Sequence, residues 1–151
     1  MTLITAGQVQ RITGLTADQL REWTTRRGLI EPDMKPCGPG SRARFSWQTV
    51  LLLRLAVVMN RAFHIELEAQ RPLFGGLARR LHGSSFPSLR GSILFLKSGA
   101  QFELRLGRDI WNLEEDALVV RLDPHLDVIS ASFAVTEPIS QLPLFPAAAV
   151  Q

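Results

Sequence analysis

Two short segments near the N-terminus begin in the same way, and they restrict the fold more than any other feature of the chain. Thr5-Ala6-Gly7-Gln8 and Thr16-Ala17-Asp18-Gln19 both have the form of a capping box, in which a threonine side chain accepts from the amide three residues later and the glutamine bonds back. The pattern predicts helices that begin at about residues 6 and 17. Thr13-Gly14-Leu15 between them is long enough only for a tight turn. The predicted arrangement is a helix-turn-helix.

The second predicted helix has a polar outer face. Five apolar residues of the two helices have spacings that turn them inward: Val9, Ile12, Leu15, Leu20 and Trp23. The outer face then carries Asp18, Arg21, Glu22 and Thr25. Arg26 and Arg27, followed by Gly28, predict the end of this helix. Positive charge is favourable at the C-terminus of a helix, and glycine readily adopts the left-handed conformation of a C-cap. The outer face is the candidate surface for contacting a nucleic acid.

A loop and a buried helix are expected next. The segment DMKPCGPGSRARF, residues 33–45, has two prolines, two glycines and three basic side chains, which predicts a hairpin-like loop ending in a short strand. Ser46 can cap the following helix, and residues 50–59 are apolar nearly all round it, so we expect that helix to be buried. In a winged helix-turn-helix the loop would be the wing.

These segments resemble, in order and spacing, the DNA-binding domain of the MerR family of bacterial regulators. The resemblance covers residues 3–80 and rests on GQVQRITGLTADQLREWTTRRGLIEP, on the basic loop, and on FSWQTVLLLRLAVVM with the Ala62-Phe63-His64 break. It implies that the second helix enters the major groove of double-stranded DNA, while arginines of the wing hold phosphate groups. The DNA-binding residues expected on this basis and from their cationic cluster are Arg21, Thr25, Arg26, Arg27, Arg42 and Arg44.

The chain departs from the family pattern at two places. The family commonly has two aromatic residues after the Leu-Arg pair, whereas this chain has Leu20-Arg21-Glu22-Trp23, so an acidic side chain replaces one phosphate contact. Family members usually continue into a long dimerisation helix, whereas the helices here are expected to end near His82. A homodimer would therefore be built differently, and the following segment is the candidate for it.

The pattern changes to period two after Ser92. Residues 92–96 and 102–106 predict a β-hairpin, and residues 117–122 and 126–135 predict further strands on either side of Asp123-Pro124. A helical turn is expected at 110–115, and a break between helical turns at Gly75-Gly76. The predicted fold is α+β, with a winged helix-turn-helix domain at 1–82, a small antiparallel β module at 83–136 and an extended tail at 137–151.

The distribution of charge separates the two folded parts. Up to Arg90 the chain has 13 Lys and Arg against 6 Asp and Glu, and after it 4 against 8. A basic part next to an acidic one is typical of a nucleic-acid-binding module joined to a different module. The longest apolar run, Val50 to Met59, is interrupted by Arg54 and too short to span a bilayer, and no signal peptide is recognisable, so a cytoplasmic protein without a membrane partner is expected.

Candidate catalytic and metal-binding groups are few. Cys37 is the single cysteine of the chain, so it cannot form an internal disulfide or, by itself, a thiolate zinc site. His64, His82 and His125 have no paired spacing, and the consecutive acids 114–116 cannot all face one site on a regular element. We therefore expect that the protein is not an enzyme and that it has no cofactor and no metal site.

The tail contains a second motif. Gln141-Leu142-Pro143-Leu144-Phe145 is similar to the Gln-Leu-x-Leu-Phe peptide by which bacterial polymerases and repair proteins bind the DNA polymerase sliding clamp. The expected contacts are Gln141, Leu142, Leu144 and Phe145. The alternative interpretation is that the three apolar side chains fold back on the sheet.

Two functions follow from these features. The first is a bacterial transcription regulator, in which the MerR-like module binds an operator and the β module provides dimerisation or effector sensing. The second is a toxin-like inhibitor of DNA replication, in which the tail occupies the peptide groove of the sliding clamp and the winged helix contacts DNA or protein.

Overall fold

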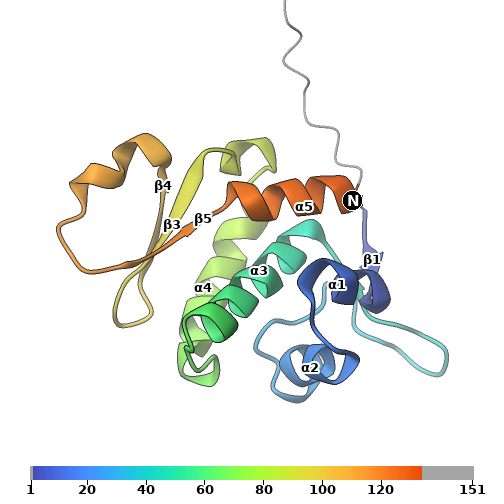
Figure 1. Cartoon of the computed structure of the whole chain (residues 1–151). Coiled ribbons are helices and arrows are strands. Elements are labelled where there is room, and N and C mark those ends of the chain that lie inside the picture. The colour runs from blue at the N-terminus through green and yellow to red at the C-terminus, as the bar shows by residue number, and fades with distance from the viewer. Residues whose placement is uncertain (1, 134–151) are drawn as a thin grey trace, which may run out of the picture.

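The protein is represented by a computed structural model of the chain, which describes residues 2–133. This part has an α+β fold with five α-helices and two small antiparallel sheets (Figure 1). Its elements are β1 (Ile4–Thr5), α1 (Ala6–Thr13), α2 (Ala17–Arg21), β2 (Arg44–Phe45), α3 (Trp47–Val57), α4 (Arg71–His82), β3 (Ser92–Leu96), β4 (Phe102–Leu106), β5 (Leu118–Arg121) and α5 (Asp123–Phe133). A π-helical turn extends α2 over Glu22–Arg26 and another extends α3 over Val58–Ala62, while short 3-10 turns lie at Glu68–Gln70, Pro87–Leu89 and Gly107–Asn112.

Both predicted capping boxes are confirmed. The Gln8 amide donates to Thr5 Oγ1 at 3.3 Å, and the Thr5 amide donates to Gln8 Oε1 at 2.9 Å. The same pair of bonds joins Thr16 and Gln19, each at 3.1 Å. Gly14 ends α1 with a φ of +74°, a conformation that glycine adopts without strain. The turn between the first two helices is therefore determined by local sequence.

Helix α3 is the centre of the core. It contacts α1, α4 and α5, and its Leu51, Leu53 and Leu55 are almost completely buried. Ser46 caps it as predicted, since the Thr49 amide donates to the Ser46 hydroxyl oxygen. Most of the buried apolar residues form one cluster that extends from Ile4 to Phe133. The predicted division after residue 82 is therefore crossed by a continuous core, and the division itself stays a prediction.

The three-stranded sheet has β3 in the middle and β4 and β5 at its edges. Leu94 of β3 pairs with Leu104 of β4 and with Val120 of β5, both antiparallel. The predicted hairpin is confirmed, and the Lys97 amide closes its turn by donating to the Gln101 carbonyl at 2.8 Å. The predicted strand at 117–122 is confirmed as β5, and the helical turn expected at 110–115 begins earlier, at Gly107.

Two expectations about the regular elements are wrong. The segment predicted as a strand at 126–135 is helical as far as the described chain extends, because Leu126, Ile129 and Phe133 recur at helical spacing and are buried. The expected break at Gly75-Gly76 lies inside the continuous helix α4. A Cβ at Gly76 would lie 3.0 Å from Phe102 Cε1, so this glycine allows a ring of β4 to approach α4 closely.

None of the helices within residues 2–133 is both long and apolar enough to cross a membrane.

Candidate nucleic-acid interface

The second helix, defined here as residues 17–26, changes its geometry halfway along. The Thr24 side chain is buried and donates to the Leu20 carbonyl at 2.7 Å. A hydroxyl that bonds to the carbonyl four residues back competes with the backbone amide and widens the helix. The Arg27 amide then donates to the Glu22 carbonyl at 2.9 Å, and Gly28 ends the helix with a φ of +59°. The left-handed cap predicted at Gly28 is confirmed.

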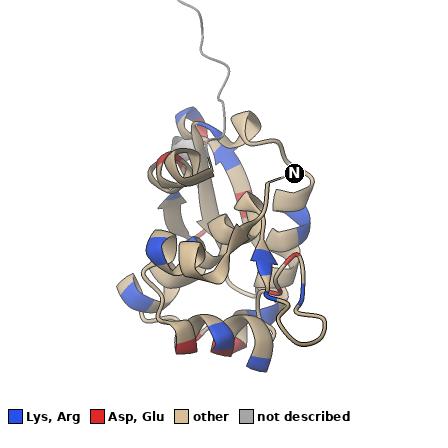
Figure 2. Ribbon diagram, turned by 90° about the vertical axis from the view of Figure 1, so that its right-hand side faces the viewer, with Lys and Arg blue, Asp and Glu red and all other residues tan. Residues whose placement is uncertain are grey.

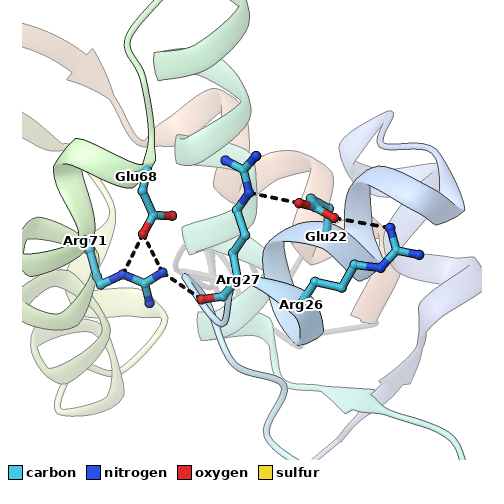
Figure 3. Close-up of polar contacts among 5 residues, drawn as sticks. All are labelled: Glu22, Arg26, Arg27, Glu68 and Arg71. Carbon is cyan, nitrogen blue, oxygen red and sulfur yellow. Dashed lines mark hydrogen bonds and ion pairs between the residues drawn. The ribbon is translucent and has the colours of Figure 1, made fainter.

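The cations of the second helix are paired with acids of the same helix. Arg27 Nε donates to Glu22 Oε1 at 2.9 Å and Arg26 Nη1 to Glu22 Oε2 at 3.3 Å (Figure 3). These bonds, from Arg27 first and then Arg26, hold the pKa of Glu22 below its ordinary value, so Glu22 is ionised at neutral pH. Arg21 lies 3.5 Å from Asp18. Figure 2 shows the resulting alternation of basic and acidic segments along the helix at the bottom of the view.

The wing, defined here as residues 34–44, is a closed loop that starts from the core. Met34 and Arg44 exchange backbone hydrogen bonds of 3.1 and 3.0 Å, and Arg44 also pairs with Thr5 of β1. At its base, Asp33 accepts from the Ser46 amide at 2.6 Å and from the Ser46 hydroxyl at 2.8 Å. The predicted hairpin-like loop with a terminal strand is therefore confirmed, and the pairing of that strand with β1 is an addition that the sequence pattern did not reveal.

The two arginines of the wing differ from those of the second helix. Arg42 and Arg44 are exposed, and neither forms an ion pair with any residue in the part of the chain that the structure describes. A groove of about 370 Å³, lined by Thr25 and Lys35 among others, lies between the second helix and the wing. The two elements are therefore neighbours. Lys35 of the wing is paired with Glu31 at 3.1 Å, whereas the charges of Arg42 and Arg44 are not neutralised by side chains within 2–133.

Arg71 fixes the end of the second helix from the first turn of α4. Its Nη2 donates to the Arg27 carbonyl at 2.7 Å and to Glu68 Oε1 at 2.7 Å (Figure 3). Its Nη1 donates to the Gly28 carbonyl at 3.3 Å. Carbonyls at the end of a helix lack intrahelical donors and carry partial negative charge, so a guanidinium suits them. The sequence gives no signal for this role of Arg71, because the two carbonyls lie more than forty positions away from it.

Two arginines of the α3 segment act in the same way on the first helix and the turn. Arg54 Nη1 donates to the Ile12 carbonyl, and its Nε donates to His125 Nδ1 at 3.1 Å. Arg61 Nη2 donates to the Gly14 carbonyl at 3.0 Å. A spacing of seven residues puts two side chains on the same face of a helix, and Arg54 interrupts an apolar run, so these were the signals in the sequence. Both arginines therefore link the α3 segment to the helix pair.

The six predicted DNA-binding residues all lie on the second helix, at its end, or on the wing, and all are exposed. The four predicted clamp-binding residues, Gln141, Leu142, Leu144 and Phe145, lie outside the described residues. Within 2–133, no three His, Cys, Asp or Glu side chains come together as metal ligands would. No protein-family model matches the sequence, and comparison with curated proteins gives no significant match.

Proposed function

We propose that the protein is a DNA-binding transcription regulator with a MerR-like winged helix-turn-helix. The observation that carries the proposal is the exposed set of five arginines and Thr25 on two adjacent elements, the second helix and the wing. Binding to DNA draws its affinity from phosphate neutralisation and its specificity from side chains in a groove. Arg42 and Arg44 suit the first role. Arg21 and Thr25, on the outer face of the second helix, suit the second.

In vitro selection from random duplexes, followed by fluorescence anisotropy at low salt, tests this proposal. We expect a preferred sequence to emerge. Arg21→Ala should change the preferred bases, since contacts with base edges determine sequence specificity. Arg42→Ala should weaken binding to all duplexes to a similar extent. A purified, folded protein that binds no duplex at low salt would reject the regulatory function.

The motif of the tail supports a second candidate function, binding to the bacterial sliding clamp with inhibition of replication as the result. Leu142, Leu144 and Phe145 would enter apolar pockets of the clamp while Gln141 bonds at the rim. Burial of three such side chains contributes roughly 5 to 8 kcal/mol before the entropy of association is subtracted, so the peptide alone should bind weakly. Simultaneous contacts of the folded part with DNA would raise the effective affinity.

Calorimetry of the full chain with purified clamp tests the second function. Leu144→Ala with Phe145→Ala should abolish clamp binding and leave the thermal stability unchanged. In a cell, the same double change should relieve growth arrest caused by overproduction. If the unmodified protein gave no heat of binding, or if the double variant lost stability, the motif would have a structural role instead of binding the clamp.

We further propose that a homodimer forms through the sheet. A two-fold operator requires a symmetric contact, and β4 and β5 each have one edge without a partner strand among residues 2–133. Leu106 of β4 is also 41% exposed. Sedimentation of the full chain should give the mass of a dimer, and Leu106→Glu should shift it toward the monomer. If the unmodified protein were a monomer, the proposed homodimer through the sheet would be rejected.

A further inference from the structure

A pocket of about 420 Å³ lies where the end of the second helix, the base of the wing, α3 and α4 meet. Leu29, Ile30, Leu52 and Phe74 give it largely apolar walls. On the α4 side the wall is Gly75, where a Cβ would meet only Arg79 Nη1, at 3.8 Å, apart from its own helix and chain neighbours. The size and lining match those of sites that enclose the nonpolar part of a small molecule.

Two side-chain links join α4 to the candidate DNA-binding elements, and residues that line this pocket form both. Arg71 donates to the carbonyls of Arg27 and Gly28 at the end of the second helix. His82 Nε2 lies 3.3 Å from Asp33 Oδ1 at the base of the wing. A molecule in the pocket would therefore contact residues that set the positions of the second helix and the wing relative to α4.

The charge at the pocket is negative. The Asp33 side chain is 15% exposed, and its contacts include Ser46, Thr49 and the imidazole of His82. Burial acts to raise the pKa of Asp33, but hydrogen bonds from Ser46, Thr49 and His82 outweigh it, so the pKa lies below its ordinary value. Arg71 is already paired with Glu68 at 2.7 Å. The carboxylate of Asp33 is thus the charged group of the pocket that lacks a Lys or Arg partner within 2–133.

We propose that this pocket binds a small organic cation, a flat apolar amine whose ammonium group bonds to Asp33 and whose hydrocarbon part lies against Gly75 and Ala78 of α4. The contact of His82 with Asp33 is the longest of those measured at this carboxylate, and an ammonium group replaces it with a charge-assisted bond. Occupancy then moves the wing relative to α4 and changes the affinity for DNA. That last effect rests on the proposed function, whereas the binding of the cation does not.

Calorimetry of the full chain with three probes of one shape tests the binding: 1-naphthylmethylamine, 1-naphthylmethanol and 1-naphthoate. We expect the amine to bind at least about tenfold more tightly than the alcohol, a difference of about 1.4 kcal/mol, and the carboxylate to bind more weakly than either. Equal affinities for the amine and the alcohol, or tighter binding of the carboxylate, would overturn the proposal.

Two variants, Gly75→Leu and Asp33→Asn, test whether the probe binds in this pocket. Gly75→Leu fills the pocket from α4 and should lower the affinity for the amine at least about tenfold. Gly7→Leu, at an exposed helical glycine of α1 far from the pocket lining, is the matched control and should bind like the unmodified protein. Asp33→Asn should remove the preference for the amine over the alcohol. Thermal unfolding checks that each variant is folded, and Gly75→Leu decides the outcome if Asp33→Asn does not fold. Unchanged amine binding by folded Gly75→Leu would reject this pocket as the site.

The same amine separates the two proposals when it is added to a DNA-binding titration. The affinity for DNA should change in the unmodified protein and in Gly7→Leu but not in Gly75→Leu. Binding of the amine by a protein that binds no duplex would support the pocket and reject the regulatory function. Binding of DNA with no heat from the amine would reject the pocket alone.

Discussion

The N-terminal helix pair with its wing and the C-terminal sheet with α5 both bury apolar residues in one core, but they differ in the polar bonds that their backbones receive. The first part receives hydrogen bonds on its backbone carbonyls from Arg54, Arg61 and Arg71. The C-terminal part contributes Leu122, Leu126 and Ile129, which are all fully buried. The position of the candidate DNA-binding elements therefore depends on these polar bonds as well as on apolar contacts, whereas we expect the apolar contacts of α5 to contribute mainly to stability. Substitutions in the two parts should separate DNA binding from stability.

The largest effect on stability is expected in α5. Leu126→Ala removes a fully buried side chain from the interface of α5 with the core, and such a change costs about 2 to 5 kcal/mol of unfolding free energy. Val128→Ala, on the exposed side of the same helix, is the control and should cost well under about 1 kcal/mol. Chemical denaturation measures both. Similar losses for the two variants would show that α5 does not pack as described.

A pH-dependent effect on stability is expected at His125 of the same helix. Burial first, and then the charge of Arg54, lower the pKa of His125 from 6.5 to about 4. The unfolded chain binds the proton more readily, so the contribution of this group to stability is complete above pH 6.5 and is lost as the pH falls toward 4.

His125→Asn should flatten this dependence, because the amide oxygen can still accept from Arg54 without titrating. His64→Asn is the control, since His64 is exposed and asparagine tolerates its positive φ of 53°. Thermal unfolding from pH 7.5 to 4 measures the effect. An identical pH profile for His125→Asn and the unmodified protein would contradict this assignment.

A smaller effect on stability, accompanied by a loss of DNA binding, is expected at Arg71. Arg71→Ala removes the donors at the Arg27 and Gly28 carbonyls, which costs about 1 kcal/mol at this half-exposed site. Affinity for DNA should fall by more than stability alone accounts for, because the second helix loses its fixed orientation. Arg71→Lys retains the charge without the planar fork and should restore the function only in part. If Arg71→Ala retained the full affinity for DNA, Arg71 would not be needed to orient the second helix.

The smallest effect is expected at Glu22, and it has the opposite sign. Glu22→Gln frees Arg26 and Arg27 from their ion pairs, which lie at exposed positions and therefore contribute little to stability. Affinity for DNA should rise a few-fold at low salt, measured by anisotropy, with little change in unfolding free energy. Glu31→Gln, which frees Lys35 of the wing, is a matched comparison. Weaker DNA binding in Glu22→Gln would show that the acid contributes to the interface.

Local signals in the sequence were sufficient for the N-terminal part. The two capping boxes, the turn glycine, the left-handed cap at Gly28 and the cap at Ser46 each depend on residues within a few positions of one another, and the structure has all of them. The hairpin of β3 and β4 was likewise indicated by its period of two and its turn. Such features can be predicted because the interacting groups are neighbours in the chain.

Long-range features could not be predicted in the same way. Residues after Asp123-Pro124 include β-branched and aromatic types that favour a strand, whereas the spacing of Leu126 and Ile129 favours a helix. Packing of these two side chains in the core decides between the two signals. The bonds of Arg71 to the Arg27 and Gly28 carbonyls depend on the tertiary fold. The apolar pocket beside Asp33 likewise combines segments from residue 28 to residue 82.

The most direct test of the account is the dependence of DNA affinity on salt concentration. Because Arg42 and Arg44 have no ion pairs within 2–133, we expect them to contact phosphate groups, so their joint replacement by Ala should reduce the slope of log affinity against log salt by about 2. Arg108→Ala with Arg121→Ala removes the same charge from exposed positions of the sheet region and should leave the slope unchanged. Equal slopes for the unmodified protein and the wing variant, or an equal reduction in both double variants, would contradict DNA binding through the wing.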